Sequence, residues 1–232
     1  MNQEYKVVEH FVSINGEGIL AGQLALFIRF QGCNLNCSYC DTKWANQKDT
    51  PCEVMTKDEL CQLAVESQIH NITLTGGEPL LQEEIEYLIA GLLERGLHVE
   101  IETNGSVRIE PVRNKIIHLL TKKDRIAELS FTVDYKLISS EMESHMQMEN
   151  YTFLRKNDTV KFVSGSIEDL KRAEEIIGKY QLHKKCHVYI SPVYGAIDAA
   201  DIVEYMKTHY MNGINLQLQL HKFIWDPAER GV

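Results

Sequence analysis

The chain has 232 residues, of which 44% are hydrophobic and 25% charged, and its formal net charge is -9. Chains of up to about 250 residues often form one domain with a full core. The acidic balance repels polyanions and the Lys-Lys pairs at 122–123 and 184–185 are too short for a basic patch, which disfavours direct nucleic-acid binding. The first residues lack a secretory-signal profile and no run of about 18 apolar residues occurs. We therefore expect a cytoplasmic protein that contacts no membrane.

Short apolar, β-branched runs recur along the chain, and each has the length of a buried strand. In chain order they are residues 24–30, 71–75, 98–103, 129–135, 159–163 and 186–191. A later run, 215–223, alternates between apolar and polar residues, which predicts an edge or terminal strand.

Amphipathic stretches of helical length lie between several of these runs and begin at Thr56, Gln82, Ser166 and Asp198. Two open like a capping box, because Thr56 is followed by Glu59 and Ser166 by Asp169 three residues later. Strands that alternate with helices predict an α/β fold with a parallel sheet, either open or curled into a full or partial barrel. No repeat, low-complexity tract or linker divides the chain, so we expect a single domain over residues 1–232.

Polar and glycine-rich segments directly follow the predicted strands. They are QGCNLNCSYCDT (31–42), GGEP (76–79), NGS (104–106) and SPVYG (191–195). Functional sites on parallel sheets collect at the carboxyl ends of the strands. We therefore expect these four segments to surround one mouth.

Cys33, Cys37 and Cys40 are spaced by four and then three residues. That spacing also fits one buried face of a helix. Gly32 and the asparagines between the cysteines favour a loop instead, since they are poor helix formers and good turn formers. In a reducing compartment, three thiols in one loop indicate metal binding or catalysis rather than disulfides.

Zinc and an iron–sulfur cluster are the two candidates for this loop. Structural zinc takes four protein ligands, commonly in two pairs, and the chain has no second Cys-x-x-Cys pair. Cys52, Cys61 and Cys186 are interpreted as packing or surface residues. A cubic cluster normally takes four thiolates, so three leave one iron open to an outside ligand, which indicates catalysis.

The Cys-x-x-x-Cys-x-x-Cys loop resembles the signature of the radical S-adenosylmethionine superfamily. Tyr39 before the last cysteine and Gly76-Gly77 after the next strand strengthen the resemblance. It implies a 4Fe-4S cluster that passes one electron to bound S-adenosylmethionine, and a 5′-deoxyadenosyl radical that takes a hydrogen atom from substrate. Taken alone, the glycine pair fits either a tight turn ended by Pro79 or a close approach of backbone to a ligand.

Residues 16–22, GEGILAG, nearly match a dinucleotide-binding fingerprint. That fingerprint needs a helix directly after the glycines, whereas residues 24–30 predict a strand. The sequence also contains no GxxxxGK, HExxH or GxSxG motif. Hydrolase and nucleotide-triphosphatase functions therefore lack support.

Further segments resemble the 7-carboxy-7-deazaguanine synthase family. They are INGEG (14–18), FIRFQGCNLNCSYCDT (27–42), TGGEPLLQ (75–82), IETNGS (101–106) and LQLHK (218–222). The resemblance implies conversion of 6-carboxy-5,6,7,8-tetrahydropterin to 7-carboxy-7-deazaguanine with loss of ammonia, in queuosine biosynthesis, with S-adenosylmethionine and magnesium. It also implies an abbreviated partial (β/α) barrel, a homodimer, and an electron donor such as flavodoxin or ferredoxin.

The same resemblance implies four groups of site residues. The cluster ligands are Cys33, Cys37 and Cys40, and the magnesium contact is Thr42. The S-adenosylmethionine contacts are Tyr39, Cys40, Asp41, Gly77, Glu102, Asp134, Lys136, Ser191, Pro192, Val193 and Tyr194. The pterin contacts are Ile14, Asn15, Gly16, Arg29 and Thr75.

Two of these assignments also have a physical argument. A single hydroxyl such as that of Thr42 can serve magnesium, because this ion keeps several waters and takes oxygen ligands. The planar guanidinium of Arg29 can grip the carboxylate of the pterin with two hydrogen bonds. Otherwise Arg29 is an edge or mouth residue, and residues 14–16 are only a turn between strands.

The chain departs from the family pattern in three places. Residues 133–136 read VDYK where many relatives read SPK, and SPVYG occupies the place of another cofactor-binding segment. The chain also ends in WDPAERGV, which is longer than some family ends, so the terminal carboxylate of Val232 has no assigned role.

Two other functions remain open from the sequence. An activase that places a glycyl radical on a partner protein would share the cysteine loop and the GGEP segment, but would not need INGEG or LQLHK. A non-enzymatic zinc module that mediates contacts is the alternative from another class.

Overall fold

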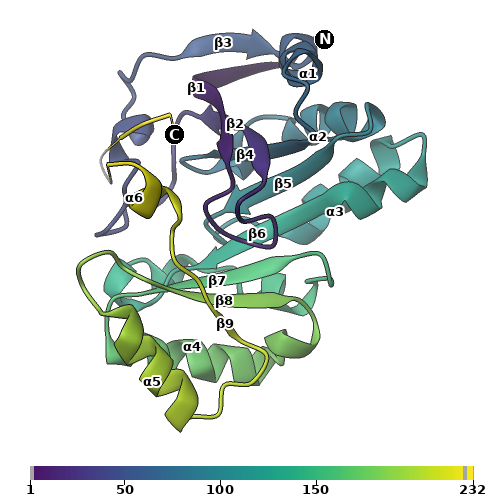
Figure 1. Ribbon diagram of the computed structural model, residues 1–232. Coiled ribbons are helices and arrows are strands. Elements are labelled where there is room, and N and C mark those ends of the chain that lie inside the picture. Colours follow the sequence, from purple (N-terminus) through teal and green to yellow (C-terminus); the bar gives the residue numbers. More distant parts are fainter. Residues whose placement is uncertain (1–2, 227–228, 232) are drawn as a thin grey trace.

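The computed structural model describes residues 3–226 and 229–231. In this part of the chain, nine strands form one sheet in the order β3-β1-β2-β4-β5-β6-β7-β8-β9. β1 pairs antiparallel with β2 and with β3, and every other neighbouring pair is parallel. The sheet curves without closing, and its order ends at β3 and β9, so the predicted abbreviated partial barrel is confirmed (Figure 1).

The six strands expected from the apolar runs all form, each within one residue of its predicted ends. The strands are β1 Glu4–Ile14, β2 Leu24–Phe30, β3 Glu53–Thr56, β4 Asn71–Gly76, β5 His98–Thr103, β6 Leu129–Tyr135, β7 Thr159–Ser164, β8 His187–Pro192 and β9 Asn215–Leu216. β1 and β3 were not predicted from the sequence. Both strands lie at the β3 end of the sheet and contain exposed as well as buried residues, so neither stands out as an apolar run.

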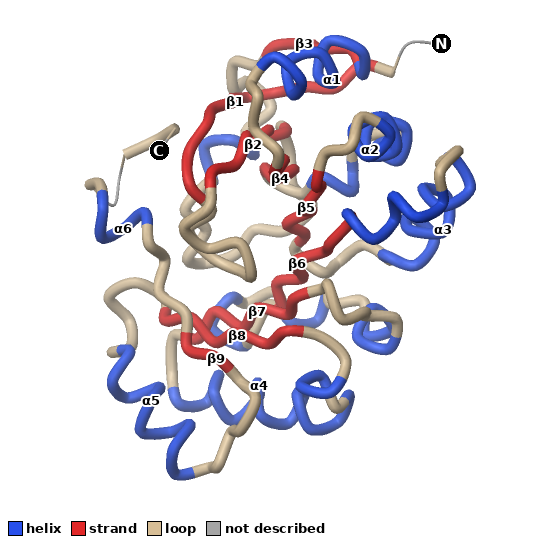
Figure 2. The backbone as a smooth tube through the Cα atoms, turned by 45° about the vertical axis from the view of Figure 1, so that its right-hand side comes forward, coloured by secondary structure: helices blue, strands red, loops and turns tan. Residues whose placement is uncertain are grey.

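Helices cover the outer face of the curved sheet, as Figure 2 shows for α2, α3, α4 and α5. The helices are α1 Lys57–Glu66, α2 Ile85–Glu94, α3 Ile109–Leu119, α4 Ile167–Tyr180, α5 Ala199–Thr208 and α6 His221–Ile224. The four predicted helices are therefore present. α3 was not predicted, although Ile109, Val112 and Ile116 form its buried stripe at helical spacing.

The two predicted capping boxes differ. Thr56 and Glu59 form the complete reciprocal pair at the start of α1. Ser166 accepts from the Asp169 amide at 3.2 Å, but the Asp169 carboxylate accepts from the amides of Gly165 and Ser139 instead of returning a bond to Ser166. The prediction is half right at α4, because that carboxylate ties down a neighbouring loop.

The prediction of a strand over residues 215–223 is wrong in its length. β9 is the edge strand, as expected, but it ends at Leu216. The Gln217 amide still donates to Ile190, and the Leu220 amide then donates to Gly16 at 3.1 Å. The chain leaves the sheet because this bond draws it toward the loop after β1, and α6 follows.

The parallel strands present two different faces. The side chains that pack outward against the helices are apolar and fully buried, as Ile72, Val99 and Phe131 show. Their neighbours in sequence point inward and are polar. Alternation of side chains along a strand therefore places one polar residue in every two on the inner wall.

A buried ion pair joins α3 to the start of β7. Arg113 donates to both oxygens of Asp158 at 2.7 and 2.6 Å, and Asp158 also accepts from the backbone amides of Phe131 and Arg155. Both charged side chains are almost fully buried. The four hydrogen bonds satisfy Asp158 only while Arg113 is present.

We expect Arg113→Ala to lower the free energy of unfolding by about 3–5 kcal/mol, because it leaves the Asp158 charge buried without its partner. Urea unfolding of the apo-protein measures the change. Lys207→Ala removes one partner of an exposed pair on α5 and should change stability by less than about 0.5 kcal/mol. Equal losses in the two variants would contradict the argument from burial.

Candidate active site

A cleft of about 650 Å³ opens at the carboxyl ends of the parallel strands. Its wall includes residues from all four segments that follow the predicted strands, namely Cys33, Gly77, Asn104 and Pro192 among others. The expectation of one shared mouth is confirmed.

Nearly all the predicted site residues line this cleft. They are Ile14, Gly16, Arg29, Cys33, Cys37, Tyr39, Cys40, Asp41, Thr42, Thr75, Gly77, Glu102, Asp134, Lys136, Pro192, Val193 and Tyr194. Asn15 and Ser191 lie behind the wall instead. Asn15 is buried and accepts from Thr73, and Ser191 is buried and donates to Glu17 at 3.3 Å.

The three cysteines lie in a loop with no helix, as predicted, and all three face the cleft. Hydrogen-bond donors surround two of the sulfurs. Cys33 Sγ accepts from the Leu35 amide at 3.4 Å and from Asn104 Nδ2 at 3.5 Å, and Cys40 Sγ lies 3.6 Å from the Thr42 hydroxyl. Burial raises the pKa of the Cys33 and Cys37 thiols, so it favours their protonated form, and a metal centre that binds them would have to displace these protons.

The donor set fits an iron–sulfur cluster better than a single metal ion. Within residues 3–226 and 229–231, no three His, Cys, Asp or Glu side chains are placed to hold one ion together. A zinc site needs its sulfurs about 2.3 Å from a common point. A cubic cluster instead takes one thiolate on each iron, so its three cysteines stand farther apart, and N–H donors to the sulfurs tune such centres.

The glycine pair is required by the backbone around it. Gly76 has φ +137, and a Cβ there would lie 2.4 Å from the Phe30 carbonyl oxygen. A Cβ on Gly77 would lie 1.9 Å from the Gly32 carbonyl oxygen. The GGEP and cysteine segments therefore cross in direct backbone contact, and only glycine permits that approach.

The inner wall also carries a network of buried charges, of which Asp134 and Lys136 were predicted from the sequence and Glu17 and Lys161 were not. Lys161 Nζ lies 2.9 Å from Glu17 and 3.8 Å from Asp134, and Lys136 Nζ lies 2.8 Å from Asp134. Burial alone would raise the pKa of Asp134, but Lys136 and Lys161 outweigh it and hold this pKa below its usual value. Asp134 is therefore a carboxylate at neutral pH and keeps both lysines charged.

Two further contacts orient polar groups toward the cleft. Thr75 donates to Glu102 at 2.8 Å, and burial raises the pKa of the Glu102 carboxyl. Arg29 Nε donates to Glu9 at 2.7 Å. Because the Glu9 contact uses Nε, it fixes the plane of the guanidinium on the inner wall beside Thr75.

Several residues of the wall had no site role assigned from the sequence. They are Glu9, Phe11, Glu17, Phe27, Leu35, Trp44, Asn46, Gly76, Thr103, Asn104, Thr132, Lys161, Val163, Gln219, His221, Lys222, Glu229, Arg230 and Gly231. Alternation in the predicted strands could have found Thr132 and Lys161, since both stand at inward positions between apolar neighbours. Trp44 and Arg230 offered no signal, because their contact, 4.3 Å from guanidinium to ring, joins distant segments. Val232 lies outside the described residues.

Comparison with known proteins identifies the family. Residues 27–131 match the family model of the radical SAM superfamily. The chain is 52% identical to the 7-carboxy-7-deazaguanine synthase of Clostridium acetobutylicum over 98% of this chain and 99% of that protein. It is 37% identical to the 7-carboxy-7-deazaguanine synthase of Methanospirillum hungatei, over 96% and 86% of the two chains. The chain belongs to the 7-carboxy-7-deazaguanine synthase family.

The fold agrees with this membership. The crystal structure of QueE from Escherichia coli superposes with a TM-score of 0.70 over 93% of this chain and 94% of that one, at 20% identity. This chain is thus a radical S-adenosylmethionine lyase, and it uses a 4Fe-4S cluster and S-adenosylmethionine. No helix among the described residues has the length and apolar character needed to cross a membrane.

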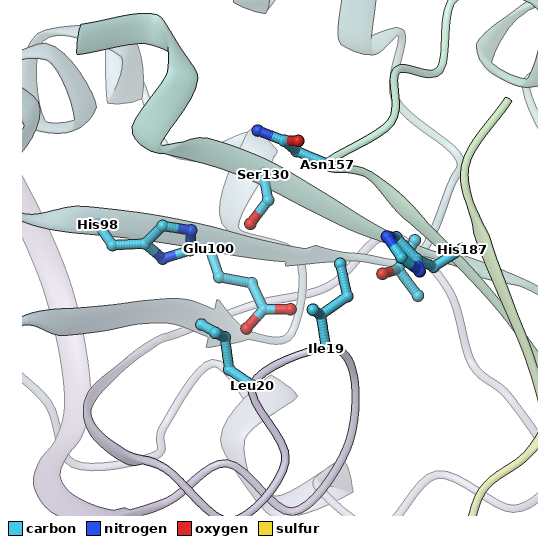
Figure 3. Close-up of a pocket in the computed structure, with 8 residues that line it drawn as sticks. Ile19, Leu20, His98, Glu100, Ser130, Asn157 and His187 are labelled. Carbon is cyan, nitrogen blue, oxygen red and sulfur yellow. The ribbon is translucent and has the colours of Figure 1, made fainter.

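This family member has a second, smaller cavity of about 170 Å³ at the amino ends of the strands. Figure 3 shows Glu100 of β5 directed toward Ile19 and Leu20, which belong to the loop between β1 and β2. Glu100 accepts from the Thr132 hydroxyl at 2.6 Å. Burial, and then the nearby Glu102 charge, raise the pKa of Glu100 to about 7.

The raised pKa of Glu100 makes stability depend on pH. The folded protein holds the Glu100 proton more tightly than the unfolded chain, whose carboxyl has the model value of 4.5. The Glu100 contribution to the free energy of unfolding should therefore fall as the pH rises from about 4.5 to 7. Glu100→Gln removes this contribution, and should be more stable than the wild type above pH 7 by about 3 kcal/mol.

Urea unfolding of both apo-proteins at pH 5, 6, 7 and 8 measures this difference. Glu53→Gln, on the exposed edge strand β3, serves as the control and should follow the wild type at each pH. A constant difference between Glu100→Gln and the wild type across this range would contradict the raised pKa.

Proposed function

We propose that this chain converts 6-carboxy-5,6,7,8-tetrahydropterin to 7-carboxy-7-deazaguanine with loss of ammonia, as a step of queuosine biosynthesis. The observation that supports this most is the shared cleft. The three-cysteine loop and the Arg29 guanidinium face the same space of about 650 Å³, which suits a cofactor beside a carboxylate substrate. The relatives named 7-carboxy-7-deazaguanine synthase agree with this reaction.

Different residues of the cleft are assigned to different cofactors. We assign the cluster to Cys33, Cys37 and Cys40, with S-adenosylmethionine between that loop and Gly77. When bound, these groups supply the one-electron chemistry that cleaves the C–S bond of S-adenosylmethionine. The protein holds the cofactor and substrate in place and keeps water away from them. Lys161, fixed by Glu17 and Asp134, contributes a positive charge that does not move.

The remaining S-adenosylmethionine contacts lie along the strand ends. We assign them to Tyr39, Cys40, Asp41, Glu102, Asp134, Lys136, Pro192, Val193 and Tyr194, which all line the cleft. Ser191 would act from behind the wall, because its hydroxyl donates to Glu17.

The pterin has its own set of contacts, on the side of β1 and β2. We assign it to Ile14, Gly16, Arg29 and Thr75 in the wall, with Asn15 behind them. The Asn15 side chain has one amide nitrogen without a partner among the described residues, next to this wall. The Glu9 contact of Arg29 holds the guanidinium in one plane, which suits a two-bond contact to the substrate carboxylate.

Magnesium, the partners and the compartment complete the proposal. Thr42 follows the cysteine loop in the cleft wall and offers a hydroxyl oxygen to magnesium. A flavodoxin or ferredoxin would supply the electron, and the protein would act as a homodimer in the cytoplasm, without direct contact with nucleic acid. One sheet contains strands from Glu4 to Leu216, which supports a single domain over residues 1–232.

Anaerobic reconstitution tests the cluster assignment. Alanine at Cys33, Cys37 or Cys40 should abolish the acid-labile sulfide of the reconstituted protein and its cleavage of S-adenosylmethionine. Cys52→Ala is the matched control, because this thiol is exposed and does not line the cleft, and it should retain both. Stoichiometric zinc without sulfide in the wild type would refute the cluster.

The reaction itself is tested with the same protein, S-adenosylmethionine, magnesium, a reductant and 6-carboxy-5,6,7,8-tetrahydropterin. Chromatography should show 7-carboxy-7-deazaguanine formed over many turnovers for each S-adenosylmethionine. Cleavage of S-adenosylmethionine without this product would favour another reaction of the superfamily.

Arg29→Lys should raise the KM for the pterin by about 10–100-fold, because an ammonium cannot reproduce a two-bond contact with a carboxylate. Steady-state rates over a range of pterin concentrations measure KM and kcat separately. The KM of this variant for S-adenosylmethionine should stay within about twofold of the wild-type value. Arg108→Lys replaces an exposed arginine and should behave as the wild type. A loss in kcat alone would place Arg29 away from the substrate carboxylate.

A further inference from the structure

The Asn104 side chain lies directly against one of the cluster cysteines. Asn104 follows the last residue of β5, and its Nδ2 is 3.5 Å from Cys33 Sγ and 3.1 Å from Asn34 Oδ1. The residue is buried, with 7% of its surface exposed. An N–H donor in this position reaches the sulfur without an intervening water.

The neighbouring Ser106 fixes which end of the Asn104 amide faces the sulfur. Asn104 Oδ1 accepts from the Ser106 backbone amide at 2.9 Å and from the Ser106 hydroxyl at 2.6 Å. A backbone N–H can only donate, so the group that faces it must be the amide oxygen. Nδ2 is therefore directed at Cys33, and the reversed orientation would place two donors against each other.

The backbone of Asn104 is anchored by Glu78 of the GGEP segment. Glu78 Oε2 accepts from the backbone N–H of Asn104 at 2.6 Å. Glu78 Oε1 accepts from the Thr103 hydroxyl at 2.9 Å and from the backbone N–H of Leu80 at 3.0 Å. Glu78 is fully buried. Because these bonds occupy both carboxyl oxygens, the turn that carries Asn104 cannot withdraw from the cysteine loop without leaving buried groups unpaired.

A second asparagine near the loop lacks this arrangement. Asn46 Nδ2 lies 3.9 Å from Cys40 Sγ, at the outer limit for a bond to sulfur. Its Oδ1 is buried and has no hydrogen-bond partner among the described residues. Nothing comparable to Ser106 therefore sets the direction of the Asn46 amide.

Donors to the sulfurs of an iron–sulfur cluster favour the reduced form, because reduction adds negative charge to the centre. We propose that Asn104 is a positioning residue whose amide donates to the Cys33 sulfur and raises the reduction potential of the cluster, with Ser106 and Glu78 fixing its direction and place. This inference rests on the proposed cluster ligands. It concerns the ease with which a reductant loads the electron, before any substrate is involved.

Asn104→Asp tests this directly. Aspartate keeps the shape of the side chain and an oxygen for Ser106, but it replaces the N–H that faces the sulfur with a second oxygen. In a redox titration of the reconstituted protein monitored by electron paramagnetic resonance, its one-electron reduction should be at least tenfold less favourable at a given potential. That factor lowers the midpoint by about 59 mV.

Asn104→Ala removes the donor without adding a charge, and should lower the midpoint in the same direction by a smaller amount. Asn46→Ala is the matched comparison and should shift it less than Asn104→Ala. Iron and sulfide contents of all the variants should match those of the wild type.

Three results would overturn the inference. They are an unchanged midpoint in Asn104→Asp, equal shifts in the Asn104 and Asn46 alanine variants, and loss of the cluster from Asn104→Asp, which would make this residue necessary for assembly. A wild type that holds no cluster would instead refute the proposed function. The two failures are therefore distinguishable.

Discussion

The ion pair between Glu17 and Lys161 links the loop after β1 to β7, two parts of an open sheet that do not pair with each other. Glu17 lies in the loop after β1, and Lys161 projects inward from β7, 144 residues later. The same carboxylate accepts from Ser191 on β8 and from Gln219 in the segment before α6. A closed barrel would fix these parts through strand pairing, but here the sheet order ends at β3 and β9. Contacts to the buried Glu17 carboxylate therefore position these segments, as backbone hydrogen bonds would in a closed barrel. These contacts lie inside the cleft.

The cysteine loop depends on a second constraint, the backbone contact between Gly32 and Gly77. This contact leaves no room for a Cβ, and it places Glu78 where its carboxylate can reach the turn after β5. That turn returns a side-chain amide to Cys33. The ends of β2, β4 and β5 are thus linked beside Cys33, so the position of this cysteine is set mainly by backbone groups and their immediate partners.

The sequence predicted the parts of this molecule that local patterns encode. The buried parallel strands, four outer helices, the loop form of the cysteine segment and the gathering of strand ends follow from periodicity, turn residues and the rule for parallel sheets. β1 and β3 escaped notice because their burial alternates irregularly at a partly covered end. The end of β9 at Leu216 depends on a bond from Leu220 to Gly16, which no local pattern contains. The partners of Glu17, Asn104 and Arg230 are likewise set by contacts between distant segments.

Separation of the two strand faces has a consequence for how such a protein can diverge. The outward residues, such as Ile72, Val99 and Phe131, pack against the helices, and their burial stabilises the fold. The inward residues line the cleft and contact whatever binds there. A substitution at Thr75 or Thr132 therefore leaves the packing against the helices as it was, but it removes a hydrogen bond to the buried carboxyl group of Glu102 or Glu100. The two faces are therefore constrained in different ways, the outer face by the shape of its packing and the inner face by the pairing of its buried polar groups.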